Sequence, residues 1–192
     1  MRRVDFRLLG GSILILAGAA ILAVALVGYL RSPAWQTIHA EEVLQAPSLT
    51  SEIQGPLPGS ALARLRIPRI GLDVAVIEGT DPADLLKAPG HMTGSALPGG
   101  PANCILAGHR DLHFKRLGEL QRGDRVDLQA GERTYSYRID SIKIVAPTES
   151  SVLQPGNEAI LTLITCYPFR FVGSAPKRYV VVARLAGSAE SP

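Results

Sequence analysis

The uncharged run from Leu8 to Leu30 most strongly limits how this chain of 192 residues can fold. As a helix it would extend about 34 Å, enough to cross a hydrocarbon layer of about 30 Å. Three basic residues precede it (Arg2, Arg3 and Arg7), and such residues stay on the cytoplasmic side of a membrane. The sequence therefore predicts a single-pass membrane anchor with the N-terminus inside and the remaining chain outside.

A cleaved signal peptide is the alternative interpretation of the same run. Ser32 and Ala34 supply a pair of small residues at cleavage-site spacing. The apolar region of a signal peptide is usually about 7–15 residues, however, and Arg31 separates this longer run from the small pair. The retained anchor is the better interpretation, and both interpretations export the rest of the chain.

The positive charge of the chain comes entirely from its N-terminal segment, positions 1–31. This segment holds four of the 20 Lys and Arg but only one of the 17 Asp and Glu, which leaves 16 of each sign in residues 32–192. The formal net charge of +3 therefore belongs to the flank of the anchor. Because the exported part lacks a basic excess, we expect no nucleic-acid partner.

The exported part divides into a linker over residues 32–60, a domain over 61–186 and a flexible tail over 187–192. The linker holds scattered Pro, Ser, Gly and Glu, with one possible short helix around residues 38–45. Short segments rich in β-branched and aromatic residues follow, with Gly and Pro between them. We expect strands at residues 61–67, 72–77, 104–107, 125–128, 135–145, 159–165 and 179–185, and helical turns within 81–87 and 114–120. This pattern is typical of a β-barrel or β-sandwich.

Cys166 is the first candidate for chemistry. It follows an apolar strand at the point where a loop containing Pro168 begins. A nucleophile held at a strand end is rigid and still accessible to substrate. The alternative is a structural cysteine, since unpaired cysteines are among the most buried residues.

His109 and Arg178 are the other two candidates, and both lie at strand ends. His109 follows Gly108, which permits close backbone approach; His113 and His91 are its rivals, while His39 lies in the linker. Arg178 opens the apolar strand at 179–183, and Arg170 and Lys177 are nearby alternatives.

Three such side chains in one pocket would form an acyl-transfer site. A thiolate attacks, histidine moves the proton, and a fixed cation stabilises the oxyanion. The sequence contains no CxxC, no HExxH, no EF-hand loop and no phosphate-cradling glycine loop. We therefore expect no metal and no cofactor.

Three motifs of the chain resemble those of sortases, a bacterial family of cysteine transpeptidases. Residues 162–166 read TLITC and resemble the family's TLxTC signature. Residues 107–110 (AGHR) resemble its catalytic-histidine strand, and residues 176–181 (PKRYVV) resemble the strand that carries its essential arginine. The resemblance covers about residues 61–186, and the CYPF of residues 166–169 is most similar to class D.

The resemblance implies a closed, eight-stranded, all-β barrel with short helices after one N-terminal transmembrane helix, the topology typical of this family in the bacterial cytoplasmic membrane. Cys166 would cleave a sorting signal similar to Leu-Pro-x-Thr-Gly after its Thr and form a thioacyl enzyme. An amine would then resolve it, either a cell-wall precursor or a Lys of a pilin-like subunit. His109 would act as acid and base, Arg178 would bind the substrate and the oxyanion, and Thr165 and His91 would contact the substrate.

The two cysteines of the exported part could in principle form a disulfide. A bond between Cys104 and Cys166 would remove the nucleophile. We therefore expect a free thiol at Cys166 and interpret Cys104 as a small apolar core residue on the strand before His109.

Two other functions remain open from the residues. An L,D-transpeptidase would use the same chemistry on a peptidoglycan stem peptide, but those enzymes carry the cysteine in an SxGC-type context close after a histidine. Here His109 and Cys166 are far apart in the sequence, and the cysteine follows Ile164-Thr165. A barrel that only binds is the second alternative, and the presence of all three polar candidates argues against it.

Overall fold

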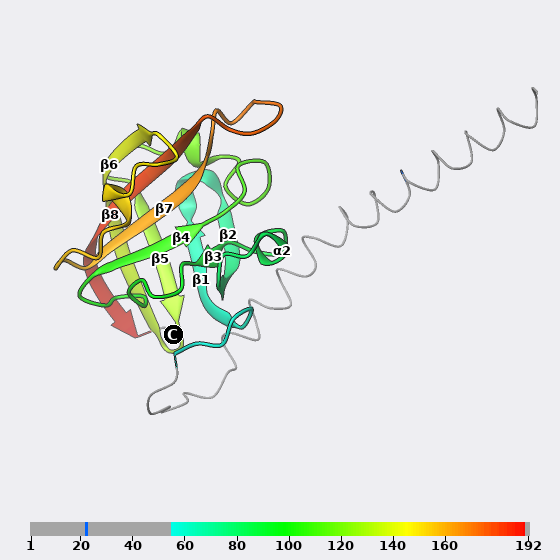
Figure 1. The fold of residues 1–192 in the computed structure, drawn as a ribbon. Helices are drawn as coiled ribbons and strands as arrows, with labels where there is room; N and C mark the ends of the chain where they lie inside the picture. The colour runs from blue at the N-terminus through cyan, green and yellow to red at the C-terminus, as the bar shows by residue number, and fades with distance from the viewer. Residues whose placement is uncertain (1–21, 23–54, 191–192) are drawn as a thin grey trace, which may run out of the picture. The chain divides into compact units, whose positions relative to one another are not determined.

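The computed structural model describes residue 22 and residues 55–190, in which eight β-strands form a closed barrel in the order β1-β2-β3-β4-β7-β8-β6-β5 (Figure 1). This confirms the predicted all-β fold. The strands are β1 (Ala61–Ile67), β2 (Leu72–Glu78), β3 (Gly90–His91), β4 (Asn103–Ala107), β5 (Arg125–Ala130), β6 (Arg133–Val145), β7 (Ile160–Tyr167) and β8 (Lys177–Glu190). The short helix α2 (Pro82–Leu85) and three 3-10 turns, η1 (Pro68–Ile70), η2 (Leu117–Glu119) and η3 (Ser151–Leu153), connect them.

Alternating apolar residues fill the interior of the barrel. On β1, the predicted inward face of Ala63, Leu65 and Ile67 is fully buried. Successive strand residues point to opposite faces, so one strand contributes every second residue to the core. The same alternation places Leu161 and Leu163 of β7 and Val181 and Ala183 of β8 in this core.

Two strand pairs that share β7 decide which distant segments meet. β4 pairs in parallel with β7, from Asn103 opposite Ile160 to Ala107 opposite Ile164. On its other side β7 pairs with β8 as an antiparallel hairpin. The segments that follow β4 and β7 therefore leave the barrel at the same end, together with the start of β8.

Several expected boundaries need correction. The predicted flexible tail is wrong for residues 187–190, because β8 continues to Glu190, which pairs with Arg133 of β6. That stretch lacks apolar alternation, and its order comes from the long edge offered by the 13 residues of β6. The strand expected to end before Cys166 runs on to Tyr167. The two-residue strand β3 was too short to produce a sequence pattern.

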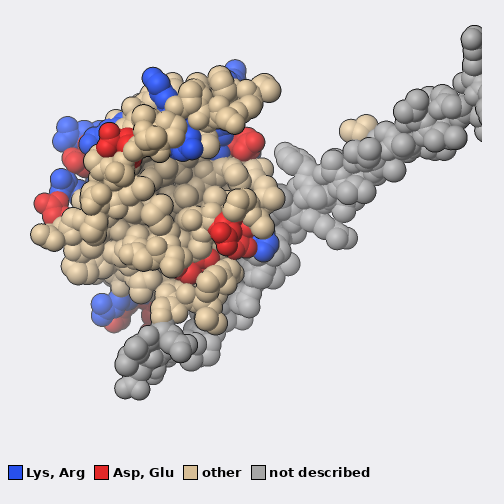
Figure 2. Space-filling view, in the orientation of Figure 1, with Lys and Arg blue, Asp and Glu red and all other residues tan. Residues whose placement is uncertain are grey.

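The predicted anchor, apart from Leu22, and the linker up to residue 54 lie outside the described residues. Within the part of the chain that the structure describes, no helix combines the length and apolarity needed to cross a membrane. On the face of the barrel shown in Figure 2, Lys and Arg alternate with Asp and Glu near the edge, around a broad uncharged centre.

Candidate active site

Cys166 lies on the outer face of the barrel. Leu161, Leu163 and Thr165 lie on the inward face of β7, and Thr165 is 2% exposed. Because successive strand residues point to opposite faces, the side chain of Cys166 points outward. It is partly exposed, and its thiol is free. The strand backbone thus holds a thiol rigidly at a position that solvent reaches.

Arg178 lies directly across from Cys166. The two are register partners in the β7–β8 pair, and side chains of paired residues project from the same face. The Arg178 guanidinium donates from Nη1 to the carbonyl oxygens of Lys177 (3.1 Å) and Ala175 (3.3 Å). Of the nearby alternatives, Lys177 pairs with Tyr167 and Arg170 is exposed in the connection between the strands.

His109 lies on the other side of β7. His109 is two residues after Ala107, and Cys166 is two residues after Ile164, the register partner of Ala107. His109 and Cys166 therefore lie at the same level along the strand direction. The Gly108 amide continues the ladder by donating to the Ile164 carbonyl at 3.1 Å. A Cβ on Gly108 would lie 2.7 Å from the ring of the core residue Phe114. Gly108 therefore faces inward, with no space for a side chain, and the half-buried His109 follows on the outer side.

Three adjacent strands thus carry a thiol, an imidazole and a guanidinium to one end of the barrel. The thiol strand is in the middle, between the histidine strand β4 and the arginine strand β8. This order suits nucleophilic catalysis, because an acid or base and an oxyanion donor can approach the reacting carbon from opposite sides.

The sequence model of the sortase domain family matches residues 65–186, a range that includes Cys166, His109 and Arg178. The chain belongs to the sortase family. It is 40% identical over 130 residues to Sortase D of Bacillus subtilis, an alignment that covers 67% of this chain and 66% of that protein. The chain thus spans slightly less than two thirds of the length of this curated relative.

Solved sortase structures agree with this assignment. A Clostridium perfringens Sortase D5 transpeptidase superposes with a TM-score of 0.70 at 26% identity, covering 80% of this chain and 99% of that one. Sortase E1 of Streptomyces coelicolor, solved with a tripeptide in the active site, has a TM-score of 0.63 at 28% identity and covers 71% of this chain and 94% of that one.

Thr165 of this sortase connects the cysteine strand to the histidine segment. Its Oγ1 donates to the buried carbonyl of Gly108 at 2.7 Å. Both backbone polar groups of Gly108 are therefore bonded to β7 immediately before Cys166. Because its hydroxyl faces inward, Thr165 acts on the site by fixing its backbone, and its predicted substrate contact stays a prediction.

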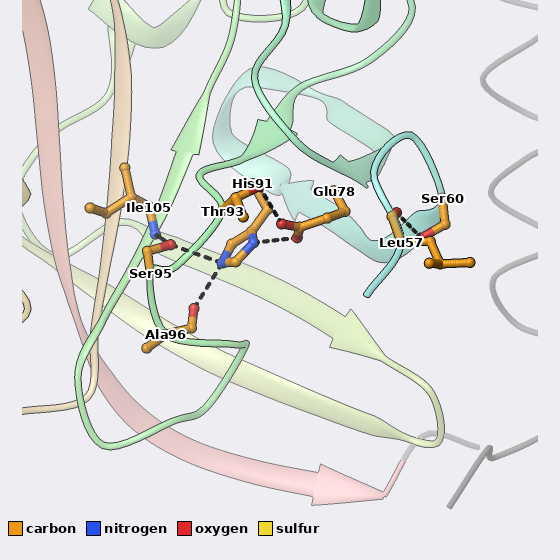
Figure 3. Close-up of polar contacts among 8 residues, drawn as sticks. All are labelled: Leu57, Ser60, Glu78, His91, Thr93, Ser95, Ala96 and Ile105. Carbon is orange, nitrogen blue, oxygen red and sulfur yellow. Dashed lines mark hydrogen bonds and ion pairs between the residues drawn. The ribbon is translucent and has the colours of Figure 1, made fainter. Parts of the chain in front are cut away.

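His91, the other expected substrate contact, is not brought to this cluster. It pairs with Glu78 on one side and with Leu106 on the other, on the inner face of the sheet, and is 2% exposed. Figure 3 shows its ring between the Glu78 carboxylate on one side and Ser95 and Ala96 on the other. Nδ1 lies 2.6 Å from Glu78 Oε2, and Nε2 lies 3.0 Å from the Ala96 carbonyl. With both ring nitrogens engaged inside the barrel, His91 is suited to a positioning role.

His113, the other rival of His109, is also buried, in the segment between β4 and η2. It is 8% exposed, and its pKa is lowered to about 4, first by burial and second by the positive charge of His109 when protonated. A hydrogen bond with the backbone of Leu86 acts in the opposite direction. A buried imidazole that stays neutral is a poor proton donor at neutral pH, so the site favours His109.

The buried neutral state of His113 predicts a loss of stability in acid. Between pH 6.5 and 4 the unfolded chain binds a proton that the folded ring does not, so the free energy of unfolding falls as the pH falls through this window. The slope is at most about 1.4 kcal/mol per pH unit, and less to the extent that solvent reaches the ring. Urea unfolding at several pH values should show a flatter dependence for His113→Gln than for the wild type. Equal slopes would contradict the assignment.

Two polar residues of this region escaped the sequence analysis. Glu78 ends the apolar strand β2 and is 2% exposed, and a single carboxylate after four buried residues was the available signal. Arg110 follows His109 and was visible only as the last letter of the AGHR motif. Its contacts lie in the distant segment that follows Cys166, beyond the reach of any local pattern.

Proposed function

We propose that this sortase is a cysteine transpeptidase that cleaves a sorting signal similar to LPxTG after its Thr and transfers the acyl group to an amine on the cell surface. The observation that carries the proposal is the position of Cys166 on the outer barrel face, between the strand leading to His109 and the strand that carries Arg178 near its start. The tripeptide in the active site of the related Sortase E1 supports a peptide substrate.

The proposed first step forms the thioacyl enzyme. The Cys166 thiolate attacks the Thr carbonyl carbon, and the Arg178 guanidinium stabilises the resulting oxyanion. The tetrahedral intermediate collapses, the C–N bond breaks, and His109 donates its proton to the departing amine. The Thr acyl group is then bound to Sγ through a thioester.

The second step transfers this acyl group to an amine. The incoming amine attacks the thioester carbon and gives its proton to His109, and Cys166 leaves as a thiolate. Cargo proteins with a C-terminal sorting signal and a cell-wall precursor or pilin-like Lys are the proposed partners. None of these steps requires a metal or a cofactor.

The same proposal places the catalytic barrel outside the bacterial cytoplasmic membrane. The uncharged run from Leu8 to Leu30 and the arginines before it support a single span with the N-terminus inside. Sorting signals and wall amines are both outside the cell, so an exported barrel would meet its two substrates there.

A peptide assay with the full-length chain in detergent tests the function. The enzyme is incubated with a library of LPxTG-like peptides and an oligoglycine amine, and products are identified by mass spectrometry. We expect a fragment ending at Thr joined to the amine. A parallel incubation with peptidoglycan stem peptides should give no product. Exchange on stem peptides alone would instead identify an L,D-transpeptidase.

A further inference from the structure

The Arg110 guanidinium bridges two loops at the mouth of the site. Its Nη1 donates to the Pro168 carbonyl at 3.1 Å, and its Nη2 donates to the carbonyls of Phe171 (2.8 Å) and Gly173 (3.2 Å). Its central carbon also lies 5.8 Å from the centroid of the Phe171 ring, a cation–π distance. One planar side chain next to His109 therefore contacts the segment that connects β7 to β8 at three separate positions.

This connection, residues 168–176, has little else to order it. Among the backbone hydrogen bonds outside strands and helices in residues 55–190, none has its donor or acceptor in 169–176. Phe169 is held by its ring contacts with Tyr167 and Tyr179, and Ala175 by the bond from Arg178. Between these two points the chain is exposed, and Arg110 supplies its hydrogen bonds.

The geometry of the connection places it beside the proposed reaction. It begins two residues after Cys166 and ends two residues before Arg178, and these two residues are themselves paired. Because Arg110 follows His109, its bonds draw the connection across toward the histidine side of β7. The segment then borders the space between the nucleophile and the acid.

We propose that Arg110 is a positioning residue that holds the 168–176 connection closed against the His109 segment as a wall of the peptide site. The proposal rests on the proposed function and deepens it. If the closed connection is the binding-competent state, the apparent dissociation constant of the peptide rises as the closed fraction falls, while the bound complex reacts as before. Arg110 therefore acts on KM more than on kcat.

Lysine does not replace arginine in this role. An ammonium is a compact point charge, whereas the planar guanidinium presents a fork of donors that reaches separate carbonyls. We expect Arg110→Lys to keep the positive charge beside His109 and still release the connection. This separates positioning from a general electrostatic effect on the histidine.

The test uses full-length wild type, Arg110→Lys and Arg110→Ala, with Arg122→Lys as the matched control, since Arg122 is 80% exposed and lies elsewhere. The first measurement is the rate of chymotrypsin cleavage after Phe171, identified by mass spectrometry, which needs no substrate. Loops that open locally are cut in proportion to their open population, so we expect cleavage about tenfold faster in both Arg110 variants and unchanged in the control.

The second measurement is steady-state peptide cleavage. A closed fraction reduced to about one tenth should raise KM about tenfold while kcat stays within about threefold. Wild-type cleavage rates in both Arg110 variants, or a Lys variant indistinguishable from wild type in cleavage and KM, would overturn the proposal. If wild type turns over no peptide, the proposed function fails, and the chymotrypsin rates still decide whether Arg110 holds the connection.

Discussion

Replacement of Cys166 by Ala should abolish formation of the thioacyl enzyme and lower acyl transfer by on the order of 10⁴-fold or more, because no other group can take over as nucleophile. Replacement of Cys104 by Ala should leave transfer within about twofold of wild type, because Cys104 is 1% exposed in the core. The measurement is the transpeptidation rate, with intact-mass detection of the acyl intermediate.

The two cysteines differ in environment as well as position. Cys104 pairs with Leu161, five residues before Cys166, so the two lie about 16 Å apart along neighbouring strands at about 3.3 Å per residue. That separation excludes a disulfide between them. Burial, and secondarily the Glu78 carboxylate, raise the pKa of the Cys104 thiol to about 12.

Thiol labelling provides an independent check on this assignment. The reactive form of cysteine is the thiolate, so iodoacetamide should modify native protein at Cys166 and leave Cys104 unlabelled. Labelling that requires a reductant, or a Cys166→Ala variant that still forms product, would contradict the assignment of the nucleophile.

Local sequence was sufficient to predict the strand that leads to Cys166, because β7 is an apolar segment rich in β-branched residues, although the strand continues two residues beyond the predicted end. The relation between Cys166 and Arg178 also follows from one hairpin. The relation to His109 depends on the parallel β4–β7 pairing, which joins segments far apart in the sequence and leaves no local pattern. There the family resemblance, rather than periodicity, supplied the expectation.

The interior polar residues were the least predictable part of the site. His91 was expected to contact the substrate, and its interior location became evident only once the two-residue β3 placed it between β2 and β4. A strand of two residues is stabilised by its neighbours and carries no pattern of its own. Likewise, the inward hydroxyl of Thr165 follows from strand alternation, but its bond to Gly108 requires the parallel partner.

Removal of the Glu78 carboxylate should destabilise the barrel strongly. Glu78 Oε2 lies 2.6 Å from His91 Nδ1, and Oε1 accepts from Thr93 Oγ1 at 2.7 Å (Figure 3). On the other side of the ring, His91 Nε2 lies 3.0 Å from the Ala96 carbonyl oxygen and 2.9 Å from Ser95 Oγ. Glu78→Ala leaves these partners unsatisfied in the interior and should cost about 3–5 kcal/mol of unfolding free energy.

Glu78→Gln is the informative comparison for this network. A glutamine amide can donate to Nδ1 of a neutral His91 and still accept from Thr93 through its oxygen, so every polar group keeps a partner and the cost should be only about 1 kcal/mol. Urea unfolding measures both variants, and Glu119→Ala, which breaks an exposed ion pair with Arg116, should barely shift the midpoint. Equal losses for Gln and Ala at position 78 would contradict the stabilising role of these hydrogen bonds. Since this network joins β2 and β3 to the segment before β4, its loss should also loosen the strand that positions His109.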